Sequence, residues 1–79
     1  MVETRRAPRH RVLKAGTIDF SGGAIDCTVR DLSCTGAAIE VPNQTGIPQK
    51  FTLDLPGDGL HLPCRVVWRR GYQIGVAFD

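Results

Sequence analysis

The sequence lacks the features that mark membrane, secreted and metal-binding proteins. No apolar run approaches the roughly 18 residues that a membrane-spanning helix needs, and the start, MVETRR, has no apolar signal-peptide segment. The cysteines Cys27, Cys34 and Cys64 are an odd number and lack the spacing of metal ligands. We therefore expect a cytoplasmic protein without membrane insertion, whose cysteines are free thiols and which holds no metal or other cofactor.

Side chains that could act as acid, base or nucleophile in an active site are also scarce. His10 and His61 have no acidic or cysteine neighbours at ligand spacing, and the sequence places no base near Cys34 that would make it a nucleophile. A chain of 79 residues forms one small domain, which has little room for a large enclosed active site. The sequence therefore predicts that the protein is not an enzyme.

From Val12 onward, apolar and polar residues alternate, which is typical of strands with one buried face. No stretch has a convincing helical period. Turn signals divide this region into six predicted strands, at residues 12–20, 24–31, 37–41, 51–55, 60–70 and 72–78. Six short strands indicate an antiparallel barrel or a small sandwich. We favour a closed six-stranded antiparallel β-barrel, because an open sheet of this size would leave long edges exposed.

The positive charge is concentrated at the start of the chain. Residues 1–14 contain five basic residues against Glu3 alone, a net charge of +4, whereas the rest of the chain has five basic and seven acidic residues, a net charge of −2. A proline and the mutual repulsion of the charges disfavour a fixed structure there. We expect residues 1–79 to form one domain, with a flexible basic arm at residues 1–11 and a β-barrel at residues 12–79.

Arg5 and Arg9 of this arm stand in the pattern RxxxR. Guanidinium groups bind phosphate in a bidentate manner, pair with O6 and N7 of guanine, and stack on flat bases. A short arm with several arginines therefore suits a compact anionic ligand that contains guanine. The alternative is a solvated basic tail or a nonspecific tether for nucleic acid.

The predicted turn DLSCTG, residues 31–36, carries a second group of polar side chains. Asp31 has the same parity as the apolar residues of the preceding strand, so it is predicted to continue the inward face at the barrel rim, followed by Ser33 if the chain stays extended. Gly36 would allow a positive φ or a close approach of the backbone to a ligand. The alternative is an Asx-turn with a helping serine, which needs no ligand.

Two aromatic residues near the end of the chain are assigned to packing. Trp68 has the parity of Val66, and Tyr72 has the parity of Ile74. Their parity places both aromatic side chains on inward faces, although either could stack a base at the end of a hairpin.

Taken together, the arm and the turn resemble the PilZ domain family. The marks of that family are an N-terminal RxxxR, a DxSxxG or NxSxxG segment and a six-stranded β-barrel. Here the motifs are RRAPR at residues 5–9 and DLSCTG at residues 31–36, and the closing RVVWRRGYQIGVAF resembles the last two strands of the family. Many members end in a C-terminal helix, whereas we expect none in this chain, because Asp79 directly follows the last predicted strand.

The resemblance implies binding of cyclic di-GMP, a bacterial second messenger with two guanines and two phosphodiesters. Arg5 and Arg9 would clamp phosphates and guanine edges, and the adjacent Arg6 would add a stacking or phosphate contact. The domain would act as a non-enzymatic receptor for this ligand and would signal to a downstream protein partner. The sequence does not identify the partner.

The resemblance also gives roles to the turn. Asp31 and Ser33 would hydrogen-bond a guanine or position the arm, and Gly36 would admit the ligand against the backbone. The predicted ligand-binding set is therefore Arg5, Arg6, Arg9, Asp31, Ser33 and Gly36.

Two other functions are kept as alternatives. A PilZ-like domain can lack nucleotide binding and regulate another protein through its surface, although such domains usually lose the motifs that are intact here. A nucleic-acid-binding barrel would use the basic arm. The chain has only five aromatic residues, most of them on predicted inward faces, so no specific nucleic acid is expected.

Overall fold

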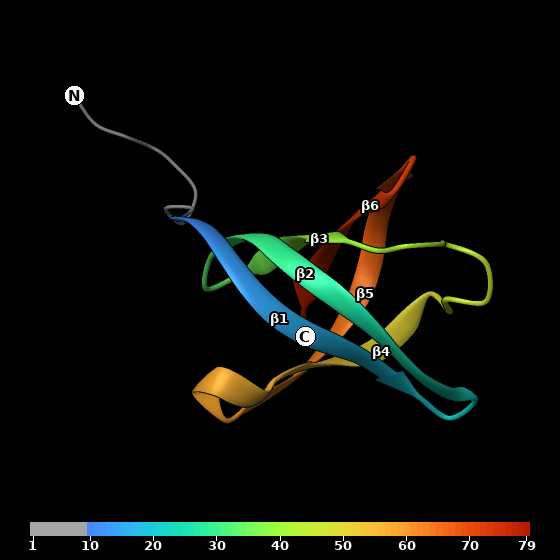
Figure 1. Cartoon of the computed structure of the whole chain (residues 1–79), viewed down its shortest axis with the longest axis horizontal. Helices are drawn as coiled ribbons and strands as arrows, with labels where there is room; N and C mark the ends of the chain where they lie inside the picture. Colours follow the sequence, from blue (N-terminus) through green and yellow to red (C-terminus); the bar gives the residue numbers. More distant parts are fainter. Residues whose placement is uncertain (1–9) are drawn as a thin grey trace.

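The computed structural model describes residues 10–79, whose strands close into an antiparallel β-barrel (Figure 1). The elements are β1 (His10–Phe20), β2 (Gly23–Leu32), β3 (Gly36–Glu40), β4 (Lys50–Leu55), the 3₁₀ turn η1 (Pro56–Asp58), β5 (Leu60–Arg70) and β6 (Gln73–Phe78). Around the barrel the strand order is β1-β2-β3-β6-β5-β4, and β4 pairs with β1 to complete the ring. The six-stranded barrel predicted from the sequence is confirmed.

The limits of the strands differ slightly from the predicted ones. β1 begins at His10, two residues before its predicted start. The rest of the predicted arm, residues 1–9, lies outside the described residues. No helix within residues 10–79 is long and apolar enough to cross a membrane.

The inward faces of the strands meet in one apolar core. Val29, Ile39 and Ile74 stand opposite one another across β2, β3 and β6, and their side chains are fully buried. Ile18 of β1 and Leu53 of β4 form a second fully buried pair. Burial of this apolar surface is the main source of the barrel's stability.

The connection between β3 and β4, residues 41–49, contributes to the core as well. Because β3 and β4 are not neighbours in the barrel, this connection crosses one of its ends. Val41 and Ile47 of the connection are buried with the core, and the N–H of Val41 donates to the carbonyl of Tyr72 at 2.8 Å. The sequence predicted a loop here but gave no signal that Ile47 would be a core residue.

A β-bulge in β2 turns Asp31 to the outer surface. Val29 pairs with the inward-facing Ile39, but Asp31 pairs with Ala38, so Arg30 is an extra residue in this strand. A bulge shifts the alternation by one position, and the side chains beyond it change faces. The prediction that Asp31 continues the inward face is therefore wrong, and the leucine that follows it packs against the core instead.

A second bulge, at Val67 of β5, turns the side chain of Trp68 to the outer surface. The residue before the bulge pairs with the inward-facing Val76, whereas Trp68 pairs with Gly75 on the outer surface. Trp68 is 43% exposed, and Tyr72, in the turn that follows β5, is 67% exposed. The prediction that both aromatic side chains pack inward is therefore wrong.

Candidate functional site

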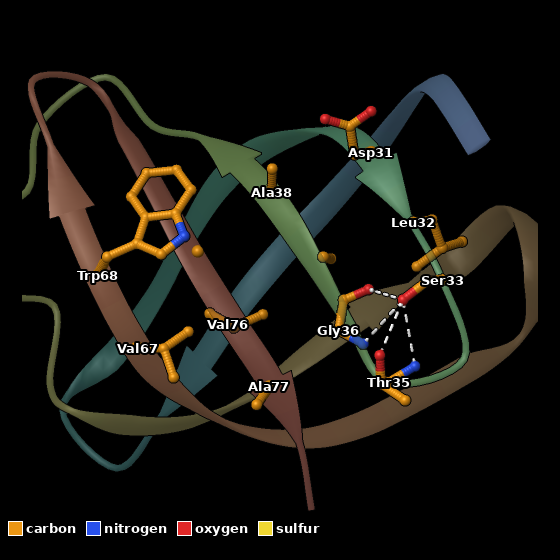
Figure 2. A pocket seen from close by; sticks show the side chains of 12 residues that line it. Asp31, Leu32, Ser33, Thr35, Gly36, Ala38, Val67, Trp68, Val76 and Ala77 are labelled. Atoms are coloured by element: carbon orange, nitrogen blue, oxygen red, sulfur yellow. Dashed lines mark hydrogen bonds between the residues drawn. The ribbon is translucent and has the colours of Figure 1, made fainter. Parts of the chain in front are cut away.

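A shallow hollow of about 340 Å³ lies on the outer surface of the barrel, over β3 and β6 (Figure 2). The end of β2 and the turn after it, with Asp31 and Ser33, form one side, and Val67 and Trp68 of β5 form the other. The hollow therefore lies outside the core, between the two places where a bulge has turned a side chain outward.

The strand register explains why this region is hollow. One row crosses β2, β3, β6 and β5 and consists of Asp31, Ala38, Gly75 and Trp68. The two central residues have the smallest side chains. The indole lies over Gly75, which is buried, so Ala38 forms the low floor between the carboxylate and the indole. Figure 2 shows Asp31 and Trp68 on either side of Ala38. Flat groups can lie on this floor and reach a carboxylate at one side and an aromatic ring at the other.

The indole of Trp68 rests on the backbone of β6. A Cβ atom at Gly75 would lie 2.1 Å from Nε1 of Trp68, which is closer than such atoms approach. Glycine is therefore required at this position for the ring to lie where it does. The sequence interpretation assigned Trp68 to packing and so did not predict that it lines this hollow. The available signal was the run Val66, Val67 and Trp68, in which three consecutive apolar residues break the alternation of a strand.

Ser33 holds the shape of the turn between β2 and β3. Its Oγ accepts hydrogen bonds from the N–H groups of Thr35 and Gly36, both at 3.2 Å, as Figure 2 shows. Its own N–H donates to the carbonyl of Gly36 at 2.9 Å. Ser33 is thus a turn-forming serine, as in the alternative interpretation, but the Asx-turn of that interpretation is not the one that the structure shows. Within residues 10–79, no hydrogen bond joins the Asp31 carboxylate to this turn, so the turn is not built on Asp31.

Gly36 is needed because β3 and β6 approach each other closely at this point. A Cβ atom at Gly36 would lie 2.2 Å from the carbonyl oxygen of Val76. The φ angle of Gly36 is not positive, unlike that of four other glycines of the barrel. The positive φ considered for Gly36 is therefore wrong, the close approach that the structure shows is to β6, and the predicted approach to a ligand stays a prediction.

Replacement of Gly36 by alanine is expected to lower the free energy of unfolding by about 3 kcal/mol, because the new methyl group overlaps a backbone carbonyl that cannot turn away. Urea unfolding measures this change. Gly57→Ala is the matched control, since a Cβ atom there meets nothing within 4 Å. Equal stability of the two variants would contradict this account of Gly36.

A comparison with known protein families identifies the family of this chain. The family model described as PilZ domain matches residues 3–79. The chain belongs to the PilZ domain family. PilZ domains are known as receptors for cyclic di-GMP and are generally binding modules rather than enzymes. A comparison with curated proteins found no match.

The start of β1, which directly follows the RxxxR motif in the sequence, pairs with the end of β2 next to the DxSxxG turn. Outside the described residues lie the arginines of the RxxxR arm, Arg5, Arg6 and Arg9. Their predicted ligand contacts stay predictions. The arm joins the barrel at His10, which pairs with Leu32, and the next residue of β1 pairs with Asp31. The point where the arm is attached therefore borders the DxSxxG turn, as a site shared by both motifs requires.

The three cysteines of this PilZ domain have different environments. Cys34, in the DxSxxG turn, is exposed, whereas Cys27 and Cys64 are buried. Burial, with a smaller contribution from the Asp26 carboxylate, raises the pKa of Cys27 to about 12. Burial, together with the Asp79 carboxylate, raises the pKa of Cys64 to about 11. Within residues 10–79, no group of His, Cys, Asp and Glu side chains is placed to hold a metal ion.

We expect a thiol reagent such as an aromatic disulfide to modify only Cys34 in the folded protein at pH 8, because the thiolate is the reactive form and the core thiols stay protonated. Unfolding should expose the other two.

Since both native pKa values lie above the ordinary value of 9.0, the unfolded chain loses protons first, and stability should fall as the pH rises above that value. Rapid reaction of all three thiols in the folded state would contradict the protection expected for Cys27 and Cys64, and urea unfolding at increasing pH measures the change in stability.

Proposed function

We propose that this PilZ domain is a non-enzymatic receptor that binds cyclic di-GMP in the hollow between Asp31 and Trp68. The observation that carries the proposal is the row across four strands, in which a carboxylate and an exposed indole, the latter lying over Gly75, stand on either side of Ala38. Both side chains face outward at bulges, and neither belongs to the buried core.

The spacing of the two side chains suits a ligand with two bases. Neighbouring strands lie about 4.8 Å apart, and the Trp68 indole lies over Gly75 of β6, two strands from Asp31, so the carboxylate and the ring are separated by roughly 10 Å. One guanine would donate its N1–H and amino hydrogens to the Asp31 carboxylate. The other would stack on the Trp68 indole, a contact that contributes about 1–3 kcal/mol. A compact dinucleotide can make both contacts at once.

The arm would supply the positive charge that the phosphodiesters need. Residues 15–79 carry a net charge of −2, so the barrel alone does not attract an anion, whereas Arg5, Arg6 and Arg9 do. In the proposed mechanism the ligand phosphates neutralise these arginines, and the arm folds across the outer face of the barrel. A downstream protein partner would then sense the new surface. Because the ligand is an intracellular messenger, we assign the domain to the cytoplasm.

Calorimetric titration with cyclic di-GMP at micromolar protein tests the proposed function. We expect saturable binding to the unaltered chain, and binding at least about tenfold weaker to Arg9→Ala, because a charge-assisted contact to phosphate is lost. Absence of heat with the unaltered chain would favour a PilZ domain that acts only through protein contacts. Equal binding of a generic single-stranded oligonucleotide, falling steeply with salt, would favour a nucleic-acid-binding barrel.

A further inference from the structure

The side chain of Arg70 covers the ring of Trp68. The two residues are two positions apart in β5 and point to the same face of the strand. The guanidinium carbon of Arg70 lies 5.9 Å from the centre of the Trp68 ring, at the distance of a cation–π contact. The ring on which we place a guanine therefore has a guanidinium above it when no ligand is bound.

The other two arginines of β5 are held elsewhere. Arg65 donates to the carboxylate of Asp79 at 2.6 Å, and Arg69 donates to the carbonyl of Ile47 at 3.0 Å. Within residues 10–79, the Trp68 ring is the only partner that the structure gives the Arg70 guanidinium. Arg70 is exposed, so its guanidinium can move away from the ring without breaking any contact that holds the barrel together.

We propose that Arg70 is a ligand-binding residue that sandwiches one guanine of the ligand against Trp68. This inference rests on the proposed function. Stacked planes are about 3.4 Å apart, so a base between the indole and the guanidinium needs a separation of roughly 6.8 Å. Without ligand the guanidinium carbon lies 5.9 Å from the ring centre, near the outer limit of a cation–π contact, and an outward movement of the exposed arginine admits the base. The planar guanidinium then covers its outer face.

The sandwich assigns different roles to the two sides of the hollow. The Asp31 carboxylate reads the hydrogen-bond donors of one guanine, whereas Trp68 and Arg70 recognise the flat shape of the other. The arginine also adds a positive charge on the barrel itself, opposite the side where the basic arm is attached. A lysine at this position would keep the charge but has no planar group that stacks.

Titration with cyclic di-GMP, followed by the fluorescence of Trp68, tests this role directly, because Trp68 is the one tryptophan of the chain. We expect Arg70→Ala to raise the dissociation constant about tenfold. Arg70→Lys should raise it nearly as much, because stacking and not charge is lost. Lys50→Ala, which removes a positive charge from β4 outside the hollow, should bind like the unaltered chain.

The outcomes separate this inference from the proposed function. If the unaltered chain shows no heat and no fluorescence change, the proposed function fails and the sandwich fails with it. If the unaltered chain binds and Arg70→Ala binds equally well, only the sandwich is overturned. Full binding by Arg70→Lys would also overturn it, because charge alone would then suffice. Thermal unfolding of each variant confirms that it folds, and Arg70→Gln gives a second uncharged replacement.

Discussion

Asp31→Asn is expected to weaken cyclic di-GMP binding about 10- to 100-fold, as measured by calorimetry. The asparagine keeps the size of the side chain but replaces one acceptor oxygen by an amino group, which then faces the donors of the guanine. A hydrogen bond to a charged group contributes about 1.5–3 kcal/mol. Because Asp31 faces outward and does not hold the turn, we expect the melting temperature of the Asp31→Asn variant to stay close to that of the unaltered chain.

Asp26→Asn is the matched control for this prediction. Asp26 lies on the same strand, is exposed, and stands outside the hollow. Its replacement removes the same charge from the same strand and should leave binding unchanged. Equal weakening by both variants would indicate a general charge effect, and unchanged binding by Asp31→Asn would contradict the role given to this carboxylate.

Trp68→Ala is expected to weaken binding about 5- to 100-fold, because the ligand loses the ring on which a guanine stacks. The loss should appear in calorimetry as a larger dissociation constant. Tyr72→Ala is the control, since Tyr72 is the other strongly exposed aromatic residue of the β5–β6 hairpin and does not line the hollow. If Tyr72→Ala weakens binding and Trp68→Ala does not, the ligand binds elsewhere on the hairpin.

The alternation of apolar and polar residues was sufficient to predict the barrel, but it misplaced the two side chains on which the site depends. The alternation of inward and outward side chains holds only while each residue of a strand pairs with one residue of the neighbouring strand. The extra residues Arg30 and Val67 each shift it by one position, so Asp31 and Trp68 face outward. The register of a strand against its neighbours decides where a bulge forms, and a single sequence does not contain that information directly.

The sequence alone could not separate the structural roles of the DxSxxG motif from the ligand-binding role that we propose for it. Ser33 forms the turn, and Gly36 permits the close approach of β3 to β6, so both are explained without a ligand. Substitution of either residue should disturb the turn as well as any binding. Asp31 is different, since it lines the hollow and, within the described part of the chain, its carboxylate makes no hydrogen bond that holds the turn. It is therefore the residue of the motif whose substitution tests binding most cleanly.

The most direct test of the central claim is an NMR titration with cyclic di-GMP that follows the backbone amides and the indole N–H of Trp68. We predict the largest shifts at Ala38, Gly75 and the Trp68 indole, because Ala38 and the indole line the hollow and Gly75 lies directly beneath the indole. Asp26, on the outer face of β2 away from the hollow, should not change. No shifts at saturating ligand, or shifts that leave the hollow unaffected, would contradict the account.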